Sequence, residues 1–315
     1  MTRPLLAWAS DHFEVPLPAG HPFPMSKYRA LRERLLADGV LAPSEIARSD
    51  EAPLEWLLRA HHASYVARAI AGELDAAAVR RLGLPWSPEL IARARGAVYG
   101  TVRAAEAALV HGVAGNLAGG THHAFADRGE GYCVFNDIAV AIAHLRAPGT
   151  GAARRPFVVD LDVHQGNGTA AMFAHDPGVF TFSMHARTNY PLHKEQSSLD
   201  VELEDRTGDD TYLALLDRHL PAALDRHGPD LVFYQAGVDA HEQDRLGRLG
   251  LTFDGLKERD QRVFAWCEAR GLPVVVTLGG GYGRPLEATI EAHANVWIAA
   301  RQARGRRAAV AALRD

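Results

Sequence analysis

The stretch FVVDLDVHQGNGT, Phe157–Thr169, decides the fold, because it joins a buried strand to a cluster of polar residues. Its first residues are aromatic and β-branched, which favours a strand. Asp160, Asp162 and His164 then occupy alternate positions, and alternate residues of a strand point to the same face. Burying unpaired charge is costly, so three such groups on one buried face require a partner.

Apolar runs of this kind recur along the chain and alternate with helical segments. We expect strands at 156–163, 178–184, 229–236 and 272–278, and helices at 87–112, 138–146, 209–228 and 253–271. Short β-branched runs between amphipathic helices are typical of a parallel sheet covered on both faces. The sequence therefore predicts a three-layer α/β fold, with helices on both faces of a mostly parallel central sheet, in one domain spanning residues 1–315.

Polar clusters follow several of the expected strands. DVHQGNG, GVDAHEQD and GGGYG each come at or just after the end of an apolar run, and Gly115–Asp137 is a further loop punctuated by glycines. Ligands of parallel sheets bind beyond the carboxyl ends of the strands. We therefore expect loops from different strands to converge on one site.

Composition excludes several classes of protein. The 315 residues, 47% of them hydrophobic, allow a substantial core, and the net charge of −4 offers no basic excess for nucleic-acid phosphates. No apolar run approaches the roughly 20 residues of a membrane-spanning helix, and charged residues interrupt the apolar start of the chain before a signal peptide could form. Cys133 and Cys267 are far apart and form no metal-binding or redox pair. We expect a cytoplasmic protein that neither binds nucleic acid nor spans a membrane.

Asp162 and His164 can supply an oxygen and a nitrogen ligand to one divalent metal ion. Asp239, in YQAGVDAHEQD after another expected strand, is the best candidate for a third ligand. Three protein ligands leave one zinc position open for water, which is the arrangement of catalytic rather than structural sites. The alternative is an ordinary polar strand end, and the polar groups elsewhere in the chain argue against it.

Two further motifs carry groups suited to catalysis. GGTHHAF places His122 and His123 side by side on a glycine-rich loop, which beside a candidate metal site indicates general acid and base chemistry. Asp160 would orient one of the two rings and fix its tautomer. In LGGGYGR, Tyr282 is either an exposed residue of a plain turn or a phenol aimed at an oxyanion. The glycines do not form a dinucleotide-binding motif, because the GxGxxG spacing is not satisfied.

Together these motifs resemble those of the histone deacetylase family, whose fold is shared with arginases. The resemblance runs from about His21 to about Trp297 and rests on GGTHHAFADRGEGYCVFND, VVDLDVHQGNGT, FSMH, YQAGVDAHEQDRLGRLGLT and LGGGYG, in the family's order. DVHQGNG, NYP and QDRLGRLGLT look most like the class IV type and its bacterial relatives. The resemblance implies a zinc-dependent hydrolase that removes an acyl group, acetyl or longer, from the ε-amine of lysine in proteins or peptides.

The resemblance also implies a role for each matching residue. The ligands of one catalytic zinc ion, for which iron(II) is an alternative, would be Asp162, His164 and Asp239. His122 and His123 would move protons, with Asp160 paired to His122, and Tyr282 would polarise the carbonyl. The tunnel for the acyl-lysine would be lined by Gly131, Tyr132, Tyr190, Gly280 and Gly281. A potassium ion would lie beside the zinc, held by the side chains of Asp160 and Ser183 and the backbone carbonyls of Asp162, His164 and Met184.

Position 167 departs from the family pattern. Many relatives have an aspartate where this chain has Asn167, the expected partner of His123. Asparagine accepts an N–H bond and orients the ring, but it brings no charge to raise the pKa of the imidazole. We therefore expect His123 to be neutral at rest more readily than in relatives that carry aspartate at this position. The division of acid and base roles between His122 and His123 stays open.

Three alternatives differ in substrate or in chemistry. An arginase site with two manganese ions needs a further carboxylate, typically two residues after the histidine, where this chain has Gly166. A small acetylated polyamine or other small N-acyl amine would suit acidic side chains at the tunnel mouth, such as Glu130, Glu195 or Glu242. A module that binds a metal or an acyl group without catalysis would not require both histidines and Tyr282. Acyl-chain length, physiological substrate and oligomeric state depend on packing that the motifs do not encode.

Overall fold

A single eight-stranded sheet forms the centre of the protein in the computed structural model, which describes residues 4–150 and 153–312. All paired strands are parallel, and their order across the sheet is β2-β1-β3-β8-β7-β4-β5-β6. The strands are β1 Leu6–Ala9, β2 Ile46–Arg48, β3 Val113–Asn116, β4 Pro156–Asp160, β5 Phe180–Ala186, β6 Leu199–Leu203, β7 Leu231–Gln235 and β8 Val274–Thr277.

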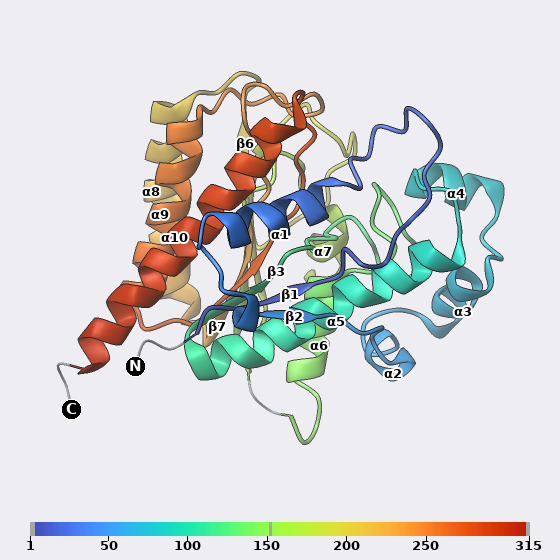
Figure 1. Ribbon diagram of the computed structural model, residues 1–315, viewed down its shortest axis with the longest axis horizontal. Coiled ribbons are helices and arrows are strands. Elements are labelled where there is room, and N and C mark those ends of the chain that lie inside the picture. The colour runs from blue at the N-terminus through green and yellow to red at the C-terminus, as the bar shows by residue number, and fades with distance from the viewer. Residues whose placement is uncertain (1–3, 151–152, 313–315) are drawn as a thin grey trace.

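Helices cover both faces of this sheet and make the fold three-layered (Figure 1). On one face α1, α8, α9 and α10 pack against one another, and on the other α5 packs on α6 and on β1, β3 and β8. The helices are α1 Lys27–Ala37, α2 Leu54–Leu57, α3 Ala63–Ala71, α4 Ala76–Leu82, α5 Pro88–His111, α6 Asp137–Leu145, α7 Asn167–Phe173, α8 Asp209–His227, α9 Phe253–Ala269 and α10 Leu286–Ala312. Each face has its own apolar core, so the central strands are buried on both sides.

Local sequence explains where the two helices of the second face begin. The Ser87 hydroxyl accepts the backbone N–H of Leu90 at 3.1 Å, and Pro88 occupies the first turn of α5, where its missing N–H costs no hydrogen bond. The Asn136 side chain likewise accepts the N–H of Ala139 at 2.9 Å and starts α6. Both predicted starts are confirmed.

The expectation that a strand continues from Phe157 to His164 is wrong, because β4 ends at Asp160. Beyond it the carboxylates accept the backbone N–H groups that a ladder would otherwise use. Asp160 Oδ1 lies 3.2 Å from Asp162 N, and Asp162 Oδ1 lies 3.0 Å from His164 N. The polar side chains therefore converge through a turn held by their own oxygens, and not through the pleat of a strand. The short strands β1, β2, β3 and β6 were not expected.

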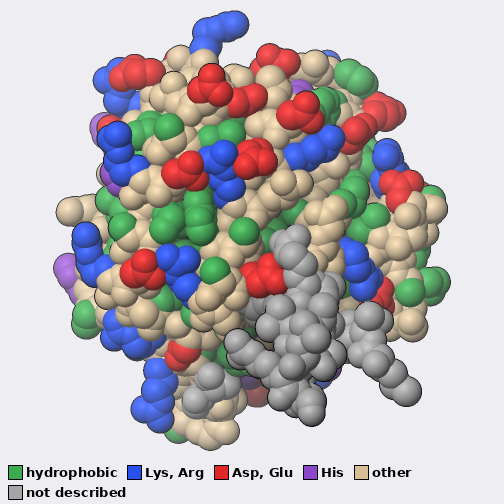
Figure 2. Space-filling view, turned by 90° about the vertical axis from the view of Figure 1, so that its left-hand side faces the viewer, with side chains coloured by type: hydrophobic (Ala, Val, Ile, Leu, Met, Phe, Trp, Pro, Cys, Tyr) green, Lys and Arg blue, Asp and Glu red, His purple; other side chains and the backbone are tan. Residues whose placement is uncertain are grey.

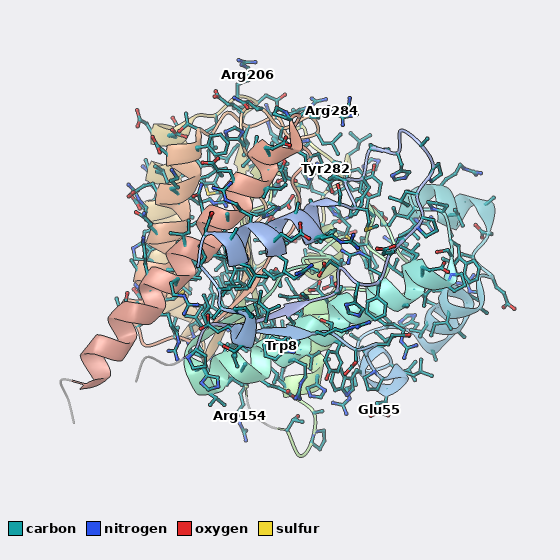
Figure 3. All side chains as sticks on the ribbon, in the orientation of Figure 1. Trp8, Glu55, Arg154, Arg206, Tyr282 and Arg284 are labelled. Carbon is teal, nitrogen blue, oxygen red and sulfur yellow. The ribbon has the colours of Figure 1, made fainter. Side chains whose placement is uncertain are left out.

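The carboxyl ends of β3, β8, β7 and β4 lie side by side in the sheet, so the loops that follow them meet at one edge. Figure 3 shows Tyr282, which follows β8, at the opposite end of the molecule from Arg154, which comes just before β4. This is the edge at which a parallel sheet binds ligands.

Charged side chains of both signs are interspersed over the face that carries the C-terminal helices (Figure 2). That face presents no broad area of one sign, which agrees with a net charge near zero for a chain of this length. Among the helices within residues 4–150 and 153–312, none combines the length and the apolarity that a membrane crossing requires.

Candidate active site

Asp162, His164 and Asp239 form a compact buried group at the carboxyl edge of the sheet. His164 Nδ1 lies 3.0 Å from Asp162 Oδ1 and 3.1 Å from Asp239 Oδ2. One ligand atom from each residue lies within 4.8 Å of the others, and all three side chains are buried. A nitrogen and two carboxylate oxygens are ligands that a divalent transition metal accepts, with a position left open. The donor set therefore fits the metal ion that the sequence predicts.

Glycines shape the cradle around these carboxylates. Gly280 donates its backbone N–H to Asp162 Oδ2 at 2.7 Å. A Cβ atom at Gly280 would lie 1.8 Å from Asp239 Oδ2, and one at Gly237 would lie 2.3 Å from Asp162 Oδ2. Only glycine at these two positions lets the loops after β7 and β8 close on the ligand group.

The carboxylates of Asp162 and Asp239 favour a positive charge between them. Burial lowers the pKa of His164, but hydrogen bonds to Asp162 and Asp239 and their charges outweigh it and raise that pKa to about 10. Burial and the neighbouring carboxylate of Asp162 raise the pKa of Asp239 to about 7. The electrostatic environment therefore favours a cation at this position.

His122 and His123 differ in their partners. His122 Nδ1 lies 2.7 Å from Asp160 Oδ2, His123 Nδ1 lies 2.7 Å from Asn167 Oδ1, and the two ring centroids are 4.1 Å apart. Burial lowers the pKa of His122, but the carboxylates of Asp160 and Asp162 outweigh burial and raise it to about 9. Burial and the positive charge of His122 hold the pKa of His123 well below its usual range. These surroundings favour a proton on the first ring and a neutral second ring.

Asp137, which the sequence analysis missed, anchors the loop that carries the histidine pair. Its carboxylate accepts the N–H of Gly120 at 3.0 Å, the N–H of Thr121 at 2.7 Å and the Thr121 hydroxyl at 2.6 Å. Gln235, at the end of β7, donates its side-chain N–H to Gly120 O at 2.9 Å. Both residues lie at the ends of expected elements, and this position was the only sign in the sequence that they could support the site.

Tyr282 closes the site from the loop after β8. Its backbone N–H donates to Asp244 Oδ2 at 2.6 Å. Burial and the charges of Asp239 and Asp162 hold the pKa of its phenol well above the usual range, so the hydroxyl remains a hydrogen-bond donor. Lys27, also missed from sequence, lies buried beneath this loop, donating to Gly279 O at 3.1 Å with Nζ 5.3 Å from the Tyr282 ring centre.

Arg259 on α9 is a second buried cation that the sequence analysis missed. Its Nη1 donates to Leu161 O at 3.2 Å and to Gly237 O at 2.7 Å, and its Nη2 lies 2.8 Å from Asp260 Oδ1. Those two carbonyls belong to the segments that carry Asp162 and Asp239. The guanidinium thus ties together the two loops that supply the metal-ligating group.

Most of the predicted tunnel residues surround one cavity with the catalytic candidates. His122, His123, Asp162, His164 and Tyr282 line it together with Gly131, Tyr132 and Gly280. Tyr190 lines an adjoining hollow at its mouth, which also reaches His123 and His164. Gly281 lies behind Tyr282, where a Cβ atom would meet Thr289 and His293.

Two residues of the predicted potassium group lie opposite each other on neighbouring strands. Asp160 at the end of β4 and Ser183 in β5 are paired residues of neighbouring strands. The Ser183 hydroxyl lies 2.9 Å from His185 Nδ1. Coordination by these side chains and by the carbonyls of Asp162, His164 and Met184 stays a prediction.

His61 gives a prediction about stability and pH. It spans the loop before α6, with Nδ1 2.9 Å from Phe125 O and Nε2 accepting the Asn136 N–H at 3.0 Å. Burial lowers its pKa from 6.5 to about 4. Below pH 6.5 the unfolded chain therefore takes up a proton that the folded protein excludes, and this stabilisation, of about 3 kcal/mol at most, is lost as the pH falls towards 4.

We expect His61→Gln to lower the free energy of unfolding at pH 7. The difference in this free energy between the variant and the wild type should become smaller as the pH falls from about 6.5 to about 4. Urea titrations at a series of pH values measure both curves. A constant difference between the two proteins would contradict the assignment of a buried neutral ring.

Comparison with known proteins agrees with this geometry. Residues 21–299 match the family profile described as Histone deacetylase domain. An uncharacterized protein of Picosynechococcus sp. is 45% identical over 289 residues, covering 92% of this chain and 96% of that protein. The Histone deacetylase-like amidohydrolase of Pseudomonas aeruginosa is 31% identical over 300 residues, covering 90% and 77%. The crystal structure of an HDAC homolog from Aquifex aeolicus has a TM-score of 0.81 at 23% identity, covering 95% of this chain and 84% of that one.

The fold and the family profile lead to the same assignment. The parallel sheet between two layers of helices is the three-layer arginase/deacetylase fold that the sequence predicts. The family profile covers almost the same segment as the motif resemblance, and at its centre lies a buried Asp–His–Asp group able to bind a metal ion. The chain belongs to the histone deacetylase family of hydrolases.

Proposed function

We propose that this protein is a metal-dependent deacylase that hydrolyses the amide between an acyl group and the ε-amine of lysine in proteins or peptides. One observation carries the proposal: Asp162 and His164 of the buried Asp162–His164–Asp239 group line a single cavity with Tyr282 and with two histidines that have different partners, Asp160 and Asn167. Binding of a metal or an acyl group alone requires neither histidine. We propose that residues 1–315 act as one cytoplasmic catalytic domain.

The residues of the site have different roles in the proposed hydrolysis. A divalent metal ion held by Asp162, His164 and Asp239, with zinc ahead of iron(II), supplies polarisation of the amide carbonyl and a lowered pKa for a bound water molecule. Neutral His123 takes the proton from the attacking water and passes it to the amine nitrogen as the C–N bond breaks. The products are a carboxylic acid and a free amine.

The remaining groups stabilise charge during this proton transfer. Protonated His122, held by Asp160, places a positive charge beside His123. The Tyr282 hydroxyl donates to the oxygen that becomes negative when water adds to the carbonyl. A potassium ion at Asp160 and Ser183 would offset the charge of that buried carboxylate.

Charge at the tunnel mouth favours a lysine peptide over a polyamine. The mouth hollow is lined by Arg80 and Arg81 from α4, and both are exposed. Of the acidic residues predicted at the mouth, Glu130 already accepts hydrogen bonds from Tyr190 and Asn167. A polyamine carries several positive charges, which two arginines repel.

This charge effect gives a prediction. Arg80→Glu combined with Arg81→Glu is expected to raise kcat/KM for acetylated spermidine relative to an acetyl-lysine peptide by about 2–5-fold per position, the scale of exposed charge pairs. Added salt should reduce the change, because the charges are exposed. Arg218→Glu on α8 is the control. An unchanged ratio would remove the two arginines from substrate choice.

The proposal is tested with a panel of lysine peptides acylated from acetyl to myristoyl, beside acetylated spermidine and putrescine. Each substrate is assayed with added zinc, with iron(II) under anaerobic conditions, and after chelation. Turnover that chelation removes and metal restores supports the proposal. No such turnover on any substrate would favour a non-catalytic binding module.

A further inference from the structure

We infer that Glu130 is a positioning residue of this reaction, which fixes the orientation of the Asn167 amide and through it the tautomer of His123. The inference rests on the proposed function. Asn167 Nδ2 donates to Glu130 Oε1 at 3.2 Å, and Asn167 Oδ1 lies 2.7 Å from His123 Nδ1. The three side chains form one chain of hydrogen bonds that ends at the candidate base.

Glu130 is held so that its carboxylate faces Asn167. Glu130 and Cys133 exchange two backbone hydrogen bonds, of 3.0 and 2.8 Å, across a tight turn. The turn places Gly131 at φ +53° and Tyr132 at φ +67°, a conformation that a non-glycine residue adopts at some cost. The Tyr190 hydroxyl donates to Glu130 Oε1 at 2.5 Å.

The neighbours of this carboxylate are hydrogen-bond donors or a cation. Arg128 Nε lies 3.5 Å from Glu130 Oε2, and the carboxylate accepts from both the Tyr190 hydroxyl and the Asn167 amide. The Glu130 side chain is 13% exposed and is therefore largely shielded from bulk water. Every neighbour named here is a donor that faces the carboxylate, whose oxygens accept.

The direction of the hydrogen bonds follows from this. The oxygens of a carboxylate accept, so the amide of Asn167 turns its N–H₂ group towards Glu130 and its oxygen towards His123. A carbonyl oxygen also only accepts, so His123 Nδ1 must carry the ring hydrogen. The lone pair then lies on Nε2, which is the nitrogen left free to take a proton.

Without Glu130 this direction would be undetermined. An asparagine amide can present either its oxygen or its N–H₂ group to a ring nitrogen. In the second orientation Nδ1 of His123 accepts, the hydrogen moves to Nε2, and the ring cannot act as a base there. An aspartate at position 167 would prevent this by itself, because it only accepts. Glu130 therefore sets the tautomer of His123 through Asn167, whereas an aspartate at position 167 would set it by direct contact.

The test exchanges the charge between the two positions. Glu130→Gln keeps the shape of the side chain but allows its amide to face either way. We expect it to lower kcat by about 10–100-fold, the scale for losing a supporting partner, with little change in KM. Asn167→Asp alone places two carboxylates at hydrogen-bonding distance, and we expect it to lower kcat as well.

The double variant Glu130→Gln with Asn167→Asp is the decisive measurement. The new aspartate accepts from His123 Nδ1–H, and the new glutamine donates to that aspartate. We expect kcat to return to within about threefold of the wild type, a coupling that independent structural damage does not produce. Glu73→Gln, an exposed substitution on the surface, is the matched control.

Ring ¹⁵N shifts of His123 in the metal-loaded protein give a second readout that needs no substrate. We expect the hydrogen on Nδ1 in the wild type and in the double variant, and a mixture of tautomers in Glu130→Gln. Wild-type kcat in Glu130→Gln, or a double variant no better than the worse single one, would overturn the inference. A wild-type protein without metal-dependent turnover overturns the proposed function instead, and the ¹⁵N shifts still test the role of Glu130.

Discussion

Asp239→Asn is expected to give a folded protein that has lost both its bound metal ion and its deacylase activity. The two oxygens of Asp239 do different work: Oδ1 accepts the N–H of Val163 at 2.9 Å, and Oδ2 faces His164 Nδ1 at 3.1 Å. Asparagine keeps an oxygen for Val163 and presents an N–H₂ group, which cannot ligate a metal, to His164. The loss of metal affinity should exceed the roughly 10–100-fold typical of removing a residue that only supports a ligand.

The metal content of the purified variant, its activity and its melting temperature measure this result together. Asp254→Asn, on the exposed start of α9, is the matched control and should change none of the three. Stoichiometric metal in Asp239→Asn would show that Asp162 and His164 bind the ion without a third protein ligand from β7.

Tyr282→Phe is expected to lower kcat by about 10²–10³-fold, the scale for losing one donor to an oxyanion. Burial and the charges of Asp239 and Asp162 keep the phenol protonated, so its hydroxyl is available to donate. The backbone N–H of Tyr282, which holds the loop on Asp244, is unaffected by the substitution. Metal content and KM should therefore remain close to those of the wild type.

Steady-state kinetics with an acetyl-lysine peptide, together with metal analysis, separate an effect on catalysis from an effect on metal binding. Tyr99→Phe on α5, whose ring stacks on Trp56 away from the cavity, removes the same hydroxyl from a surface position and serves as the control. A Tyr282→Phe protein with nearly full kcat would remove the phenol from the reaction.

The sequence predicts the parts of this protein that follow local rules. Apolar runs and caps locate β4, β7, β8 and α5, because burial and hydrogen bonding at helix ends are properties of neighbouring residues. Asp162, His164 and Asp239 were found because parallel strands bring their carboxyl ends to one edge. The structure brings together these three residues as predicted.

The contacts that the sequence did not reveal join distant parts of the fold. Lys27 contacts a loop that follows β8, Arg259 reaches carbonyls after β4 and β7, and Glu130 meets Asn167 from another loop. No local pattern predicts such contacts, because each depends on how distant segments pack. The predicted continuation of the strand to His164 was wrong partly for the same reason: besides the local bonds to Asp160 and Asp162, the distant Asp239 accepts the backbone N–H of Val163.

The strand order has a consequence for the biosynthesis of the protein. Asp162 and His164 emerge from the ribosome with β4, but Asp239 follows β7, and Tyr282 follows β8, the last strand that the structure describes. β4 is flanked by β5 and β7, so its final neighbour is made long after it. The nascent chain thus carries an incomplete ligand set until the segment after β7 has been made. Binding of the metal ion by all three ligands therefore has to wait for that segment.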